Sequence, residues 1–442
     1  MPKPPIHALV ATILCCTPLT AAAQVPSWPE PVYRQASETE VTLGQRLFYD
    51  PILSGNRNIS CATCHHPRFA TSDGLSLGMG EGGIGLGPER HPDPADLPEQ
   101  RIPRNAPALF NLGAEEFTVL FHDGRIEVDP ARPGGLRTPL DDEMVQGFAN
   151  ILSAQTMFPV LSADEMAGHY EENDVSRAVR MGRITGDGGA WDVIAKRIEA
   201  LPEYRTMFAS AYPDIAEGRP IAFTDISNAI AAFVGFEWRS DNSAFDRALR
   251  GEAPLTAEAE AGQALFYGKA GCGTCHSGRF QTDHGFHAMA APQIGPGKAE
   301  RFERHQRDIG RMRVTGRDAD AYAFRTPSLR NVAATGPWGH AGAHSDLRAF
   351  VVDHLNPTAA LSAYQPQATL PDMAVTKDDF APLADHDEQA LIARAVTAPP
   401  VSLSEDEIDQ IIAFLGALTD QGAIDGRLGV PETVPSGLPV DR

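Results

Sequence analysis

The chain has 442 residues, of which 42% are hydrophobic, so it is long enough to form a large core or two or three separate domains. Its formal net charge is −21, with the acidic residues dispersed along the sequence. A field of this sign repels nucleic acid and anionic membranes, and we expect neither as a partner. It suits a basic protein partner or a small neutral substrate.

The first 23 residues have the pattern of a cleavable export signal. One lysine precedes an apolar run from Ala8 to Leu19, and the small residues Ala21 to Ala23 follow. The apolar run is too short to span a bilayer. We therefore expect cleavage before Gln24, a periplasmic location and no membrane anchor.

Helical periodicity recurs along the rest of the chain. Apolar residues fall at helical spacing in 40–50, 190–201, 226–236 and 256–268. The segment 404–418 opens with Ser404 and Glu407 in the pattern of a capping box and continues as an amphipathic helix. Two long stretches, 74–104 and 356–400, are rich in glycine, proline or polar residues, and we expect them to be loops that cover a functional region.

The four cysteines that remain after the predicted cleavage all lie in two similar stretches, CATCHHPRF at 61–69 and CGTCHSGRF at 272–280. In a Cys-x-x-Cys-His motif each thiol adds to a haem vinyl group and the histidine binds the iron. Two disulfides, a four-thiolate zinc site and a redox-active dithiol are alternatives, but none requires a histidine after both cysteine pairs. We expect His66, the second histidine of the first stretch, to lie at the surface or beside the ligands without a specific role. The pattern predicts two covalent c-type haems, held by Cys61, Cys64 and His65 and by Cys272, Cys275 and His276.

The likeness between the two halves extends beyond these motifs. LGQRLFY at 43–49 matches AGQALFY at 261–267, PRNAPALFNLG from Pro103 matches FRTPSLRNVAA from Phe324, and FHDGR from Phe121 matches GHAGA from Gly339. Related units in the same order indicate an internal duplication with a boundary near 251–254.

With these motifs, residues 40–420 resemble the bacterial di-haem cytochrome c peroxidases, which include the MauG-type and MbnH-type enzymes. The resemblance implies a mainly α-helical fold with two cytochrome c-like domains and long loops. It implies a peroxide-reactive haem in an N-terminal domain, 24–250, and an electron-transfer haem in a C-terminal domain, 251–425, followed by a tail, 426–442.

The resemblance also implies a second axial ligand for the C-terminal haem, a short helix after the segment 335–342. That position falls on His354, where relatives carry Met or Tyr, and Met312 or Met373 is the alternative ligand. In some relatives a histidine soon after the first motif closes the N-terminal haem. The loop from Pro67 to Arg90 contains no histidine, and His91 fits this position poorly. We therefore expect the haem iron on His65 to be five-coordinate.

Three further roles follow from the resemblance. The distal carboxylate that moves a proton between the peroxide oxygens is Glu165, in FPVLSADEM, or Glu143, in TPLDDEM. His122 replaces a tryptophan that relatives use as an electron relay, so direct tunnelling or a hydrogen bond to a haem propionate is expected there. A calcium ion between the domains would take oxygen ligands from Asn105, Thr335 and Pro337.

The resemblance leaves three functions open. The first is a periplasmic peroxidase that reduces hydrogen peroxide with electrons from a small cytochrome c or a cupredoxin. The second is a MauG-like or MbnH-like enzyme that uses peroxide to oxidise a residue, such as tryptophan, of a partner protein. The third is an electron carrier without catalysis, which requires both irons to be closed by two axial ligands.

Overall fold

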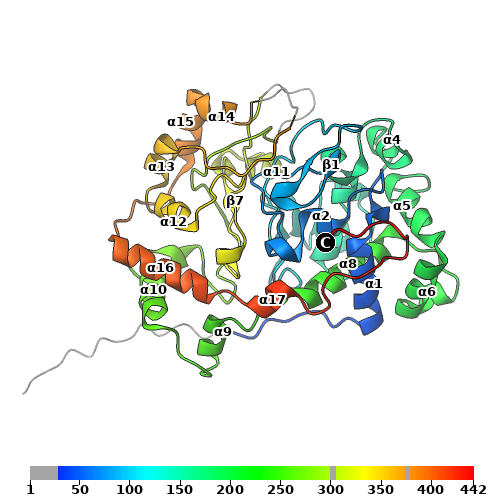
Figure 1. Ribbon diagram of the computed structural model, residues 1–442, viewed down its shortest axis with the longest axis horizontal. Coiled ribbons are helices and arrows are strands. Elements are labelled where there is room, and N and C mark those ends of the chain that lie inside the picture. Colours follow the sequence, from blue (N-terminus) through cyan, green and yellow to red (C-terminus); the bar gives the residue numbers. More distant parts are fainter. Residues whose placement is uncertain (1–27, 299–304, 374–377) are drawn as a thin grey trace, which may run out of the picture.

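The computed structural model describes residues 28–298, 305–373 and 378–442. The predicted export signal therefore lies outside the described residues. The fold is mainly helical, with three small antiparallel sheets, and it divides into two halves that lie side by side (Figure 1). Among the helices that the structure describes, none combines the length and the apolar character needed to cross a bilayer.

The elements follow one another in two runs. The helices of the first half are α1 (Glu38–Tyr49), α2 (Cys61–Cys64), α3 (Ile151–Thr156), α4 (Asp174–Arg180), α5 (Ala190–Glu199), α6 (Pro202–Ala211), α7 (Pro213–Ala216), α8 (Phe223–Glu237) and α9 (Ala244–Leu249). The helices that follow are α10 (Ala257–Tyr267), α11 (Met312–Thr315), α12 (Leu347–Leu355), α13 (Pro357–Ala363), α14 (Ala381–Ala384), α15 (His386–Ala395), α16 (Glu405–Ala417) and α17 (Gln421–Asp425). The sheets pair β1 (Gly83–Ile84) with β2 (His91–Pro92), β4 (Ile126–Val128) with both β3 (Val119–Leu120) and β5 (Leu136–Arg137), and β6 (Phe286–His287) with β7 (Phe324–Arg325).

The predicted helices α1, α5, α8, α10 and α16 are confirmed. Helix α16 begins with the predicted capping box: the Glu407 carboxylate accepts a bond from the Ser404 N–H at 2.8 Å, and the Ser404 hydroxyl accepts one from the Glu407 N–H at 3.3 Å. Each bond satisfies an N–H that has no partner within the helix. The capping-box pattern therefore predicted the start of this helix correctly.

Each half contains a matching pair of crossed helices, α1 on α8 and α10 on α16. A Cβ atom placed on Gly44 of α1 would lie 1.9 Å from the Ala229 carbonyl oxygen, and one placed on Gly262 of α10 would lie 1.8 Å from that of Gln410. Both glycines therefore permit a backbone approach that no other residue allows. They occupy equivalent places in LGQRLFY and AGQALFY, which supports the predicted duplication, although the duplication itself stays a prediction.

The two long stretches differ from each other. Residues 74–104 are irregular, as predicted, and buried Arg90 holds their glycine-rich part by donating to the carbonyls of Met79, Gly80 and Gly85. The prediction of a loop for 356–400 was wrong in part, because α13, α14 and α15 lie there. The side chains of Asn356 and Asp385 cap α13 and α15, and these caps were readable in the sequence.

Both ends of the described chain cross to the opposite half. Trp28 packs against Phe245 of α9 and Tyr267 of α10, in the smaller core that also contains Phe266 and Phe414. The C-terminal segment leaves α17 and runs back over the first half, where Val434 joins the main core and the Asp441 carboxylate accepts a 2.6 Å bond from Thr63 inside the first haem motif (Figure 1). The segment expected as a tail is therefore part of the packing around α2.

Candidate functional site

The two predicted haem-binding histidines have the same local geometry. The ring Nδ1 of His65 donates to the Thr71 carbonyl at 2.9 Å, and that of His276 donates to the Gln281 carbonyl at 3.0 Å. A hydrogen bond at Nδ1 fixes the tautomer and leaves Nε2 as the nitrogen that can bind a metal. Both rings therefore fit the role of an axial haem ligand.

The cysteines fit covalent attachment better than the alternatives. Cys61, Cys64, Cys272 and Cys275 are all free thiols, without a disulfide between them. Within the described residues, no cluster of metal-binding side chains joins cysteines of the two motifs, which excludes the four-thiolate zinc site there. His66 is not at the surface: it is 3% exposed, and its Nδ1 accepts a bond from the Arg68 N–H that starts the next turn.

The ring of His354 is hydrogen-bonded at Nδ1 in the same way as the rings of His65 and His276. It lies near the end of α12, and its Nδ1 donates to the Phe350 carbonyl at 2.8 Å. Burial and the charge of His354 lower the pKa of His276 to about 4, so His354 lies within electrostatic range of His276. This proximity favours His354 over Met312 or Met373 as the second ligand on the His276 side.

Glu165 lies on a π-helical turn, Ala163–Ala167, that is held from both sides. The Glu81 N–H donates to the Asp164 carbonyl at 3.0 Å, and the Gly55 N–H donates to the Met166 carbonyl at 2.7 Å. Gly55 precedes the first haem motif, and Glu81 belongs to the glycine-rich loop that follows it. The turn therefore fixes Glu165 beside the first motif, and π-helical turns of this kind are frequent at functional sites.

The two candidate carboxylates differ in burial and in the charges that act on them. Burial raises the pKa of Glu165, while the charges of Lys298 and Arg125 act in the opposite direction. Burial raises the pKa of Cys64, and the charge of Glu165 acts in the same direction, so Glu165 lies within electrostatic range of the first motif. Glu143, by contrast, lies exposed on a 3-10 turn, Asp141–Glu143. The geometry favours Glu165 as the carboxylate that serves the first motif.

The two halves meet at a pair of histidines that occupy equivalent places in FHDGR and GHAGA. Burial lowers the pKa of His122 well below its usual range, and the charges of Arg104 and His340 act in the same direction. His340 stacks on Phe324 with ring centroids 3.9 Å apart. Both of its ring nitrogens are buried without a partner among the described residues, which fits contact with a group that is not part of the chain.

A buried ion-pair network supports this junction. Arg104 lies 2.7 Å from the Asp123 carboxylate of the first half and donates two bonds, at 2.7 and 2.8 Å, to Asp308 of the second half. Burial alone would lower the pKa of Arg104, but the two carboxylates raise it, and Arg104 holds their pKa values below the usual range. The network ties FHDGR to the second half, and Asp123 also accepts bonds from Arg125 at 3.3 Å.

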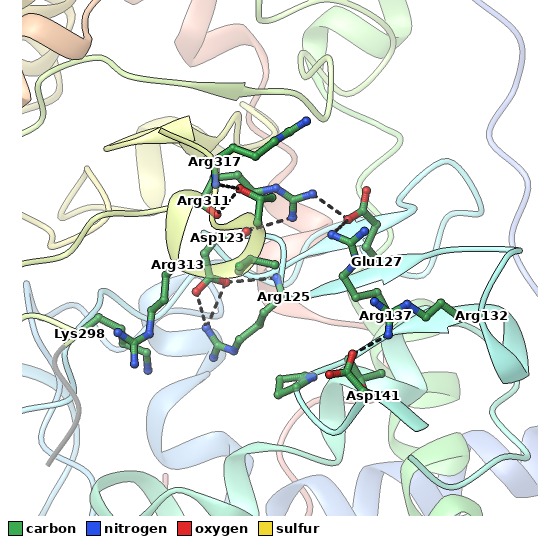
Figure 2. A pocket seen from close by; sticks show the side chains of 14 residues that line it. Asp123, Arg125, Glu127, Arg132, Arg137, Asp141, Lys298, Arg311, Arg313 and Arg317 are labelled. Carbon is green, nitrogen blue, oxygen red and sulfur yellow. Dashed lines mark hydrogen bonds and ion pairs between the residues drawn. The ribbon is translucent and has the colours of Figure 1, made fainter. Parts of the chain in front are cut away.

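A pocket of about 720 Å³ opens at the same junction. Lys298 lies on the opposite side of it from Arg132 and Arg137 (Figure 2). Burial and the charges of Arg125 and Arg104 lower the pKa of Lys298 to about 8. Lys298 and Arg125 both line the pocket, and their charges also lower the pKa of Glu165, which is not itself a lining residue. Its cationic lining residues are Arg125, Arg132, Arg137, Lys298, Arg311, Arg313 and Arg317, and its carboxylates are Asp123, Glu127 and Asp141.

The predicted calcium ligands lie near the same junction. Asn105 is 8% exposed; its backbone N–H donates to the His340 carbonyl at 2.9 Å, and its Nδ2 donates to the Leu75 carbonyl at 2.8 Å. Thr335 and Pro337 belong to the segment that leads to His340. The side-chain oxygen of Asn105 and carbonyl oxygens are hard donors that suit calcium.

Sequence reasoning missed Arg104, Lys298 and His340. The signal for His340 was present, because the internal repeat aligns it with His122. Lys298 carries no local motif, and the repeated segment PRNAPALFNLG, which contains Arg104, gives no sign of its partners. Lys298 acts on Glu165, and Arg104 pairs with Asp308, only when the two halves pack together.

Comparisons with known proteins agree with this geometry. Residues 38–254 match the family model described as di-haem cytochrome c peroxidase. The methylamine utilization protein MauG of Methylorubrum extorquens is 30% identical over 331 residues, which cover 74% of this chain and 71% of that protein. The cytochrome c peroxidase Ccp of Escherichia coli is 31% identical over 72% of this chain and 53% of its own length.

Among solved structures, a MauG-like protein associated with microbial copper homeostasis superposes with a TM-score of 0.58 at 26% identity, covering 91% of this chain and 96% of that one. Three findings point to the same family: the two Cys-x-x-Cys-His motifs, whose histidines are hydrogen-bonded at Nδ1, the mainly helical fold, and relatives of this identity and coverage. The chain therefore belongs to the di-haem cytochrome c peroxidase family of oxidoreductases, which carry two c-type haems.

Proposed function

We propose that this protein is a periplasmic peroxidase in which hydrogen peroxide is cleaved beside His65 with the help of Glu165. The observation that carries the proposal is the π-helical turn, which presents a partly buried carboxyl group next to the first haem motif. The periplasmic location rests on the export signal predicted in the sequence.

The residues around the first motif have separate tasks. A haem held there supplies the iron that binds peroxide and the redox equivalents for breaking its oxygen–oxygen bond. A Glu165 carboxylate oxygen accepts the proton of the inner peroxide oxygen and returns it to the outer one, which then leaves as water. Burial raises the pKa of Glu165, which favours the carboxyl group once it has taken this proton, and the charges of Lys298 and Arg125 favour the ionised carboxylate.

We assign electron transfer to the haem that the second motif would hold. His276 and His354 would hold its haem from both sides, which leaves no position for peroxide and suits electron transfer. His122 and His340 lie between the halves, where the buried Arg104 network keeps the junction rigid. In the peroxidase role, two electrons and two protons convert each peroxide into two waters, and the electrons come from a small cytochrome c or a cupredoxin.

A calcium ion at Asn105, Thr335 and Pro337 is part of the proposal. It is supported by the position of Asn105, which bonds to Leu75 on one side and to His340 on the other. An ion there would bind the loop after the first motif to the segment that leads to α12. Removal of calcium with a chelator should alter both haem spectra, and its return should restore them.

The second candidate function is peroxide-driven oxidation of a protein partner. It is favoured by two observations: the matched relative from Methylorubrum extorquens is a MauG, and the structure at 26% identity is described as MauG-like and associated with copper homeostasis. In this role the two oxidised haems withdraw electrons from a side chain of the partner, such as tryptophan.

One experiment separates the two roles. The protein carrying both haems is mixed with peroxide and either a reduced small cytochrome c or a tryptophan-bearing protein encoded near its gene. Catalytic oxidation of the cytochrome supports the peroxidase, whereas a mass increase on the partner's tryptophan without cytochrome turnover supports the modifying enzyme. Reaction with neither, together with no spectral response to peroxide, would contradict both.

A further inference from the structure

A cluster of acidic residues surrounds one buried histidine beside the turn that carries Glu165. His169 forms one group with Asp96 and Glu172 and another with Glu99 and Asp164. The potential ligand atoms within each group all lie within 4.8 Å of one another. We propose that His169, through Nε2, together with Glu99 and Asp164 binds one divalent transition-metal ion, separate from the haems and from the predicted calcium, while Asp96 and Glu172 lie at the Nδ1 side of the ring.

The state of His169 is an observation independent of the acidic residues. Its side chain is buried, with the residue 7% exposed, and its Nδ1 lies 3.0 Å from Glu172 Oε1. Its Nε2 is buried without a hydrogen-bond partner among the described residues. A buried polar atom without a partner is destabilising, and a metal ion bound at this nitrogen removes that cost. Glu172 at Nδ1 orients the ring, as carboxylates do for histidine ligands of metals.

The carboxylates around His169 repel one another in the absence of a cation. Asp96 Oδ1 lies 4.0 Å and Glu172 Oε1 lies 3.0 Å from the same ring nitrogen of His169, so the two carboxylates share one small space. Glu81 is 1% exposed, and its Oε2 is buried without a partner among the described residues. A divalent cation offsets this repulsion for the whole group.

The donor set selects the kind of ion. One imidazole with several carboxylates suits Zn²⁺, Mn²⁺ or Cu²⁺, whereas Ca²⁺ prefers oxygen donors alone. The site is therefore chemically distinct from the predicted calcium position at Asn105.

The ligands come from segments that are far apart in the sequence. Glu99 belongs to the long loop 74–104, and Asp164 is the neighbour of Glu165 on the π-helical turn. An ion bound here joins the loop to the turn and so fixes the position of Glu165. The binding itself does not depend on the proposed function.

Zinc titration of the protein with both haems tests the proposal. The protein is treated with EDTA, dialysed into excess Ca²⁺ to fill calcium positions, and titrated with Zn²⁺ by calorimetry. We expect one Zn²⁺ per chain. Because loss of even an outer partner of a metal ligand weakens binding by roughly 10–100-fold, His169→Ala and Glu99→Gln should each weaken it by at least about tenfold.

Two controls keep the test decisive. Glu99 is exposed, so its glutamine variant retains the fold even where His169→Ala does not. His386 is an exposed histidine between Asp385 and Asp387, and His386→Ala should bind Zn²⁺ like the unchanged protein. Cu²⁺ used as a second probe should show one imidazole nitrogen by EPR, lost in His169→Ala. Absence of saturable Zn²⁺ binding, or unchanged affinity in Glu99→Gln, would overturn the proposal.

Discussion

Replacement of Glu165 by glutamine removes the proposed proton carrier and little else. The two carbonyls that hold the turn belong to Asp164 and Met166, so the backbone bonds from Glu81 and Gly55 remain. A positioned general acid–base group contributes about 10²–10⁴-fold to a rate. At about 1.4 kcal/mol for each factor of ten, the barrier to peroxide cleavage should rise by about 3–5 kcal/mol.

The assay is stopped-flow absorption of the oxidised protein after mixing with hydrogen peroxide. Glu165→Gln should slow the peroxide-dependent spectral change by the stated factor while both haem spectra at rest stay unchanged. Glu143→Gln is the matched control, because Glu143 was the other carboxylate predicted from the sequence and lies exposed on its turn. The role of Glu165 as proton carrier would be contradicted if Glu165→Gln reacted at the unchanged rate, or if Glu143→Gln were the variant that reacts slowly.

Three further changes probe the second haem, the junction and the first loop. His354→Ala should remove the low-spin signal from the EPR spectrum of the oxidised protein, and an unchanged signal would mean that another residue is the ligand. Arg104→Met leaves Asp123 and Asp308 as buried, unpaired carboxylates, so the free energy of unfolding in denaturant should fall by about 3–5 kcal/mol at neutral pH, with a smaller loss in acid. Burial raises the pKa of Asp73 to about 7, so the folded state binds more protons than the unfolded state between about pH 4 and pH 7. As the pH rises from about 4 to about 7, the free energy of unfolding of the unchanged protein should therefore fall by up to about 4 kcal/mol relative to that of Asp73→Asn. A difference between the two proteins that does not vary with pH would contradict a raised pKa for Asp73.

Local patterns predicted a large part of the fold. Helices α1 and α16 follow from apolar spacing and from caps that lie within a few residues of the helix start. The haem motifs are contiguous, so their residues are brought together by one turn of chain. His354 was predicted by counting from a segment shared with relatives; it lies on α12, and its charge acts on His276.

The remainder depends on contacts between segments far apart in the chain, which no local pattern records. The C-terminal segment looked like a tail because it is short and rich in proline, yet Asp441 bonds to Thr63 in the first motif. Lys298 reaches Glu165 only across the junction of the two halves. The choice between Glu165 and Glu143 likewise needed the fold, since the sequence favoured Glu165 but left Glu143 as an alternative.

The two proposed haem sites differ on the side opposite the proximal histidine: we expect the His65 site to be open and the His276 site to be closed by His354. EPR of the oxidised protein at rest, with both haems in place, tests this difference directly. One high-spin and one low-spin ferric signal in equal amounts are expected. Two low-spin signals would show that the His65 site is also closed, and would contradict an open position for peroxide there.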